Sequence, residues 1–229
     1  MKVEIWSDIM CPFCYIGKRR FETALAELGL TDRVDLVWKS FQLDPDLEPV
    51  PGQSIHQYLA IRKGVSEDEG RRMNEYMTGM AAETGLEYQM DRIIVNNTLD
   101  AHRLLHLAAE SGLQSGVKER LFKAYYTEGR DIGNPEVLRE IGRSAGIDEK
   151  SIADLLATDR FRKEVRADQL EAQQLGAGGV PFFVLNRKYG ISGAQSAETF
   201  SEVLRKVLEE EKPGVIAGDG PSCDTDGNC

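Results

Sequence analysis

Two cysteines separated by two residues, in the string CPFC, stand between a strand-like and a helix-like segment. Before them, Val3 and Ile5 alternate with charged residues, which is typical of a half-buried β-strand. After Cys14, apolar residues recur every three or four positions up to Gly29, a pattern that predicts an amphipathic helix with a glycine stop. Pro12 suits the first turn of this helix, where no backbone N–H is needed. The chain is therefore expected to begin with a β–α unit that carries both cysteines at its junction.

The rest of the sequence predicts an α/β chain with a long helical interruption. A second alternating segment at 34–41 is followed by a stretch rich in proline and glycine at 45–52. From there to about Leu175 the apolar periodicity is mostly helical. The β-branched and aromatic run 180–185 then predicts a strand with a hairpin partner, and Ser196 caps a final amphipathic helix. The helical stretch is too long for a crossover and is expected to be an inserted subdomain.

The position of CPFC favours thiol chemistry. The N-terminus of a helix carries a partial positive charge and unpaired N–H groups, which lower the pKa of a thiol placed there. Cys11 is therefore expected to be an attacking thiolate. Cys14, one turn further and more buried, is expected to resolve the mixed disulfide. Pro12 and Phe13 carry no charge, so the helix terminus has to supply most of the pKa lowering.

Other interpretations of the cysteine pair stay open on the residues alone. Tetrahedral zinc needs four ligands, and no second CxxC lies nearby in the sequence. A structural disulfide is disfavoured in a reducing compartment. A non-catalytic zinc-binding or holdase module is therefore retained as an alternative to an enzyme.

A proline opens the third expected strand, after a glycine-rich loop. Such a proline cannot donate a hydrogen bond to a sheet ladder. If the Val180–Pro181 peptide is cis, the backbone of Val180 can lie beside the cysteines and pair with an extended substrate. A trans proline on an edge strand is the alternative.

Three strings in this order resemble one known family. SDIMCPFCYIGKRRFE, NNTLDAHRLLHLA and GAGGVPFFVLNRKYGISGAQS are together similar to the DsbA family of thioredoxin-fold oxidoreductases, and most similar to its cytoplasmic FrnE-like branch. The resemblance covers essentially the whole chain. It implies an α/β, thioredoxin-like fold with an inserted α-helical domain between the second and third core strands. Residues 1–52 and 177–212 would form the thioredoxin-like domain, 53–176 the insertion, and 213–229 a flexible tail.

The resemblance also implies an activity. The family performs thiol–disulfide exchange on protein substrates, by oxidation, reduction or isomerisation, with Cys11 as nucleophile, Cys14 as resolving thiol and Val180–Pro181 as the facing cis-proline loop. No cofactor is implied beyond redox-active disulfides, with glutathione as a candidate reductant. The implied partners are disulfide-containing proteins or peptides and a recycling thiol reductant or oxidant.

A second activity is the alternative within the same superfamily. Kappa-class glutathione transferases and hydroxychromene-carboxylate isomerases have a serine at the nucleophile position and use glutathione. Because Cys11 stands there in this chain, glutathione-dependent transfer or isomerisation of a small aromatic substrate is the alternative function.

Several polar and thioether side chains invite functional hypotheses. His102 and His106 lie four apart on one helix face, but no third ligand stands at a supporting spacing, so packing is favoured over metal binding and no metal is expected. By resemblance, Asn97 and His102, together with Pro12 and Phe13, are candidates to border the active cleft. The methionines are expected to pack, with an adaptable peptide-binding surface as the alternative: Met73, Met77, Met80 and Met90.

Cys223 and Cys229 form a second pair in a polar, glycine-rich end segment. A disulfide there would constrain little, so a structural role is a weak explanation. We expect an auxiliary redox pair that exchanges with Cys11 and Cys14 or feeds electrons from an external reductant, a role that the C-terminal cysteine pair of some FrnE-like proteins supports by resemblance only. An incidental or metal-scavenging tail is the alternative.

Charge and the first residues limit partners and location. The net charge is -10, with a pI of about 4.9, which disfavours nucleic-acid binding because phosphate contacts need basic surface. No apolar run approaches the roughly 18 residues of a membrane span, and the N-terminus has no signal-peptide pattern. The protein is therefore expected to be cytoplasmic, without membrane or nucleic-acid partners.

Overall fold

The computed structural model describes residues 1–211, and its centre is a four-stranded mixed sheet in the order β2-β1-β3-β4. β1 runs parallel to β2 and antiparallel to β3, and β4 pairs antiparallel with β3. Ile5 on β1 lies opposite Trp38 on one side and Phe183 on the other. The strands are β1 (Lys2–Ser7), β2 (Asp35–Ser40), β3 (Phe182–Leu185) and β4 (Tyr189–Ser192). They lie in the four segments that the sequence predicts as strands.

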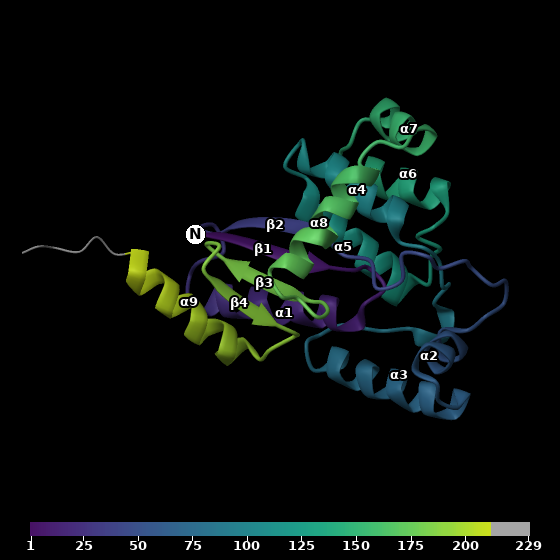
Figure 1. Ribbon diagram of the computed structural model, residues 1–229, viewed down its shortest axis with the longest axis horizontal. Helices are drawn as coiled ribbons and strands as arrows, with labels where there is room; N and C mark the ends of the chain where they lie inside the picture. The colour runs from purple at the N-terminus through teal and green to yellow at the C-terminus, as the bar shows by residue number, and fades with distance from the viewer. Residues whose placement is uncertain (212–229) are drawn as a thin grey trace, which may run out of the picture.

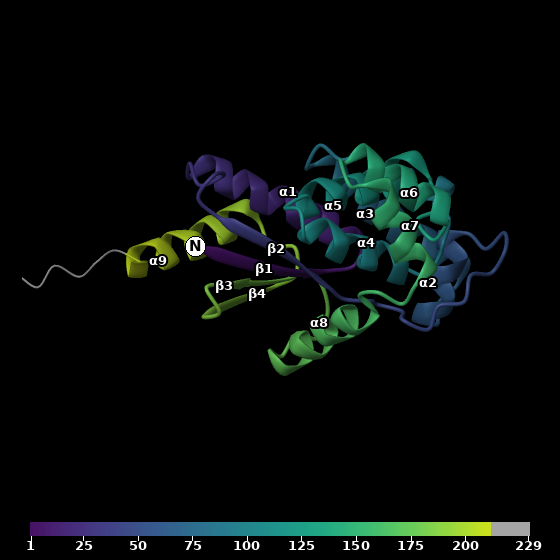
Figure 2. The same cartoon turned by 90° about the horizontal axis from the view of Figure 1, so that it is seen from above.

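Helices α1 (Pro12–Glu27) and α9 (Ala197–Glu211) cover one face of this sheet (Figure 2). Their shared core is aromatic, because the ring centroids of Phe21 and Phe183 are 5.4 Å apart and those of Phe183 and Phe200 are 4.7 Å apart. This packing fixes α1 against the sheet, and with it the cysteines at its first turn.

Helix α8 (Arg162–Gln174) covers the opposite face of the sheet (Figure 2). Trp6 on β1 is fully buried beneath α8, and its indole Nε1 donates a 2.7 Å hydrogen bond to the carbonyl oxygen of Asp168. One helix of the segment 53–176, which was expected to form the insertion, thus packs directly on the sheet.

The other helices between β2 and β3 form a layer beside the sheet (Figure 1), and the Gln114 side chain joins this layer to β2 through hydrogen bonds with the Trp38 backbone. Ser66 and Glu69 form the capping box that begins α3. The elements are α2 (Ile55–Lys63), α3 (Glu67–Ala82), a 3₁₀ turn (Met90–Arg92), α4 (Leu99–Ala109), α5 (Gln114–Lys123), a π-helical turn (Ala124–Glu128), α6 (Pro135–Ser144) and α7 (Glu149–Ala157). The predicted α/β fold with an inserted helical domain is confirmed.

Within residues 1–211, no helix has the length and apolar character that crossing a membrane requires.

Candidate active site

Cys11 lies where the chain turns from β1 into α1. It is the N-cap residue of α1, with extended backbone angles of -88° and 111°, and Pro12 follows in the first turn. The backbone N–H of Cys14 donates a 3.0 Å hydrogen bond to the Cys11 carbonyl, so both cysteines belong to the same first turn. Both are free thiols and both are buried, at 3% and 1% exposure.

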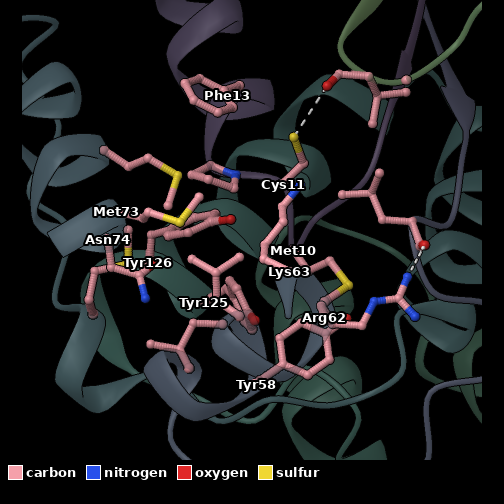
Figure 3. Close-up of a pocket in the computed structure, with 18 residues that line it drawn as sticks. Met10, Cys11, Phe13, Tyr58, Arg62, Lys63, Met73, Asn74, Tyr125 and Tyr126 are labelled. Atoms are coloured by element: carbon pink, nitrogen blue, oxygen red, sulfur yellow. Dashed lines mark hydrogen bonds between the residues drawn. The ribbon is translucent and has the colours of Figure 1, made fainter. Parts of the chain in front are cut away.

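The cis-proline loop faces the first of these thiols. The Val180–Pro181 peptide is cis, and the Cys11 Sγ lies 3.4 Å from the carbonyl oxygen of Val180, to which the thiol donates (Figure 3). Gly17 on α1 allows the close packing, because a Cβ there would lie 3.0 Å from the Cγ of Pro181. The strand that follows the loop and the helix that carries the thiols are thereby held in contact.

The electrostatics around Cys11 differ from the sequence-based expectation. The neighbouring Cys14 sulfur raises the pKa of the Cys11 thiol well above its usual value, and burial and the Asp8 carboxylate raise it further. The Cys14 backbone N–H lowers the Cys11 pKa, which is the predicted effect of the helix N-terminus, but this contribution is outweighed. The predicted net lowering of the Cys11 pKa is therefore wrong for the dithiol form, because a second buried sulfur and a buried carboxylate lie beside the first.

That carboxylate belongs to a fully buried polar cluster behind the cysteines. Asp8 Oδ2 accepts a 2.7 Å hydrogen bond from the Leu43 N–H, and Oδ1 lies 3.2 Å from His102 Nε2. Burial by itself raises the Asp8 pKa, but the hydrogen bonds from His102 and Leu43 leave it lowered. Burial lowers the pKa of His102 in spite of Asp8, so a neutral imidazole donates Nε2–H to a carboxylate.

A buried lysine completes the cluster. Lys118 on α5 is fully buried, and its Nζ donates to the Ser7 carbonyl oxygen at 3.4 Å. Burial lowers the pKa of Lys118 to about 8, while the charges of Cys14 and Asp8 act to raise it. The Lys118 side chain therefore interacts electrostatically with Asp8 and with both cysteines from behind the CPFC turn.

A cavity of about 430 Å³ opens beside Cys11, between the cis-proline loop and the helical layer (Figure 3). Its wall is mainly apolar, and the volume falls in the range of small-ligand pockets. The lining includes Cys11, Pro12, Phe13 and Val180 from the predicted site, the thioethers of Met10, Met73, Met77 and Met90, and the rings of Tyr58, Tyr125 and Tyr126. Pro12 and Phe13 thus border the cavity next to Cys11.

The remaining candidates lie elsewhere. Asn97 does not line the cavity; its side-chain amide donates to the carbonyl oxygens of Pro45 and Leu47 and so holds the loop after β2. His102 does not line it either, since its imidazole is buried against Asp8. His106 Nε2 lies 3.1 Å from Ser40 Oγ, so the two histidines are not brought to one metal.

Neither a metal cluster nor the second cysteine pair is seen in the part of the chain that the structure describes. Residues 1–211 contain no group of three or more potential metal-ligating side chains. Cys223 and Cys229 lie outside the described residues.

Four side chains near the cysteines were not identified from the sequence. Asp8 and Lys118 are far apart in the chain and meet only in the buried cluster. Tyr125 and Tyr126 occupy the π-helical turn, and no local sequence pattern predicts that turn. For Asp8, the only signal was its place in the string SDIMCPFC.

The comparisons with known proteins agree with this geometry. A family model described as a DSBA-like thioredoxin domain matches residues 2–205. A probable DsbA oxidoreductase from Streptomyces coelicolor is 39% identical and superposes with a TM-score of 0.85, over 100% of this chain and 98% of that one.

Two further similarities extend over most of the chain. The cytosolic disulfide reductase DsbM from Pseudomonas aeruginosa shares the fold, with 21% identity and a TM-score of 0.65 over 92% of this chain and all of its own (100%). The protein YwbO of Bacillus subtilis is 25% identical over 208 residues, which is 88% of this chain and 94% of YwbO.

Proposed function

The chain belongs to the DSBA-like thioredoxin domain family, and from this premise we propose that it exchanges thiols and disulfides with protein substrates through Cys11 and Cys14. The observation that carries the proposal is the 3.4 Å contact between the Cys11 Sγ and the Val180 carbonyl oxygen. Main-chain groups of this loop could pair with an extended peptide, which would bring a substrate disulfide to Cys11.

The chemistry is a pair of exchange steps. Cys11 loses its proton and attacks one sulfur of a substrate disulfide, forming a mixed disulfide and releasing the first substrate thiolate, which takes up a proton. Cys14 then loses its proton and attacks the Cys11 sulfur, and the second substrate thiol leaves. The substrate gains two electrons and two protons, and the enzyme becomes the Cys11–Cys14 disulfide. Two molecules of a recycling thiol, with glutathione as the candidate, reduce the Cys11–Cys14 disulfide back to the dithiol and become a disulfide themselves.

The proposed direction is reduction of the substrate. A dithiol is a weak reductant when its nucleophilic thiolate is strongly stabilised, as in the strongly oxidising members of the superfamily. Here Cys14, burial and Asp8 raise the pKa of Cys11, which works against that stabilisation. The proposal includes a cytoplasmic location and membership of the FrnE-like branch, which the sequence resemblance implies. Reduction of disulfides is consistent with both.

Two variants test the function. Cys14→Ser should accumulate a mixed disulfide with a peptide disulfide, because the second step is lost, and Cys11→Ser should form none. Equal turnover by wild type and Cys11→Ser would contradict the proposal.

The auxiliary role of Cys223 and Cys229 is part of the proposal and has its own test. Truncation after Gly218 should slow multiple turnover with a disulfide substrate while leaving the first turnover unchanged. Unchanged rates over several cycles would remove the auxiliary pair from the mechanism.

The cavity beside Cys11 favours one second candidate, the glutathione-dependent transfer or isomerisation of a small aromatic molecule. That function needs only the first cysteine, so its activity should survive Cys14→Ser. Loss of all activity in Cys14→Ser would exclude it.

A further inference from the structure

Two tyrosine hydroxyls in the cavity wall lack the partners that buried hydroxyls normally have. Tyr125 and Tyr126 are 0% and 1% exposed, and neither hydroxyl has a hydrogen-bond partner among residues 1–211. An unsatisfied buried hydroxyl is costly and uncommon in folded proteins. Both residues line the cavity beside Cys11 (Figure 3). The pair is therefore placed to bind a group that enters the cavity.

The backbone that carries these residues is itself unusual. Tyr125 and Tyr126 lie in the π-helical turn Ala124–Glu128, directly after α5. π-helical turns are rare and are found frequently at functional sites. The rings meet edge to face, with centroids 4.9 Å apart. The π-helical turn and the unsatisfied hydroxyls are thus two independent indications that Tyr125 and Tyr126 form a functional site.

The remaining wall suits an aromatic guest. Met73, Met77 and Met90 present thioethers to the cavity, and sulfur–aromatic contacts are favourable. Arg62 is engaged by the Asp44 carboxylate at 3.2 Å and by the Leu43 carbonyl oxygen at 3.3 Å, so it is not free to receive a carboxylate. Lys63, the other basic residue of the lining, is exposed to solvent, so the preference for a neutral guest rests on the mainly apolar wall of the cavity.

Resting on the proposed function, we propose that this cavity receives a tyrosine side chain adjacent to the disulfide cysteine of a peptide or protein substrate. Val180 and Cys11 line the same cavity, so a chain that pairs along the cis-proline loop can place a neighbouring side chain inside it. The phenol oxygen accepts a hydrogen bond from Tyr125 or Tyr126, and its own O–H can donate in return. Phenylalanine offers no such atom, and tryptophan offers only a donor.

Both wall hydroxyls remain donors over the working pH range, since burial raises the pKa of Tyr125 and of Tyr126. A site that hydrogen-bonds a substrate hydroxyl discriminates against analogues that lack it, because its polar groups are then left unpaired. The cavity should accordingly prefer tyrosine to phenylalanine, and either of them to alanine.

The test uses short peptide disulfides that carry Tyr, Phe or Ala next to the cysteine, on either side. For the full-length reduced protein, kcat/KM for the Tyr peptide should exceed that for the Phe peptide by about 3- to 10-fold. The Ala peptide should react at least about tenfold more slowly than the Phe peptide.

Variants assign the preference to the two hydroxyls. Tyr126→Phe and Tyr125→Phe should lower the Tyr-to-Phe ratio of kcat/KM towards one. Tyr76→Phe, on the exposed part of α3 with 67% of its surface accessible, is the matched control and should keep the wild-type ratio. Because the hydroxyls are unpaired, neither cavity variant should lower the unfolding temperature; a clear drop would assign them a structural role and overturn the proposal.

The outcomes separate this proposal from the proposed function. Turnover of all peptides at equal rates would overturn the tyrosine site and leave the oxidoreductase intact. Absence of turnover with every peptide would overturn the oxidoreductase itself. Competitive inhibition by p-cresol but not toluene would support a phenol site, whereas equal inhibition by both would contradict it.

Discussion

Asp8 and His102 form a completely buried hydrogen bond, with Oδ1 and Nε2 3.2 Å apart, at the point where the chain leaves β1 for the cysteines. Because the imidazole is neutral, the contact is a hydrogen bond to a carboxylate rather than an ion pair. Asp8 also binds the Leu43 N–H, so one carboxylate joins the CPFC turn, the loop after β2 and α4. His102 is thus a positioning residue behind the active site.

Loss of His102 should destabilise the protein. His102→Ala leaves the Asp8 carboxylate with fewer donors, and we expect the free energy of unfolding in urea to fall by about 2–3 kcal/mol. In a double-mutant cycle, adding Asp8→Asn should cost less in His102→Ala than in wild type, since the shared contact is already lost. Strict additivity of the two changes would contradict the contact.

The same pair predicts the pH dependence of stability. The pKa of His102 in the folded protein lies below its unfolded value of about 6.5. Just below pH 6.5, His102 is therefore protonated in the unfolded chain and still neutral in the folded one. The free energy of unfolding should therefore fall as the pH drops through about 6.5. The Asp8 carboxylate should contribute its full share of the unfolding free energy down to about pH 3.9, the pKa of an unfolded Asp. This contribution should then disappear as the pH falls further, through the lower pKa of Asp8 in the folded protein.

A single substitution isolates the imidazole in this profile. His102→Gln should flatten the dependence between about pH 7 and pH 5.5, because it removes the group whose protonation opposes folding. Parallel profiles for wild type and His102→Gln would assign the slope to other groups.

Gly17 tests the contact between α1 and the cis-proline loop. In Gly17→Ala the new Cβ would lie 3.0 Å from the Pro181 Cγ and 3.3 Å from the Ala194 Cβ, so we expect a loss of about 1–3 kcal/mol in unfolding free energy and a slower reaction with disulfides. Gly79→Ala on α3 is the control, because a Cβ there meets nothing within 4 Å and should stabilise the helix by about 0.5–1 kcal/mol. Equal effects of the two substitutions would contradict the close packing.

The raised Cys11 pKa makes a prediction about reactivity. The alkylation rate of Cys11 should rise with a midpoint above the value of about 8.5 for a free cysteine, and Cys14→Ser should lower that midpoint, because the Cys14 sulfur is the largest cause of the shift. The reduction potential should then lie nearer to the thioredoxin value of about -270 mV than to the DsbA value of about -120 mV. A midpoint below pH 7 would show that the helix N-terminus lowers the Cys11 pKa by more than Cys14, burial and Asp8 raise it.

The sequence was most informative where chemistry and local structure coincide. Cys11, Cys14 and Pro181 stand in short strings whose strand-to-helix and loop-to-strand contexts can be read directly, and the periodic segments gave the α/β architecture. The sign of the Cys11 pKa shift could not be read, because it depends on the distances to Cys14 and Asp8. The roles of Lys118, Tyr125 and Tyr126 depend on how the helical layer packs against the CPFC turn, which residue periodicity does not encode.

The most direct test of the central claim is the stoichiometry of one turnover. Reduced protein truncated after Gly218, which lacks Cys223 and Cys229, should release both thiols of one peptide disulfide per chain when it is mixed with an excess of a peptide disulfide and without recycling thiol. Mass spectrometry of digested protein should then show Cys11 and Cys14 joined with the loss of two hydrogen atoms. Release of one thiol, with the other peptide half held permanently on Cys11, would contradict a dithiol mechanism, and absence of any thiol release would contradict the oxidoreductase itself.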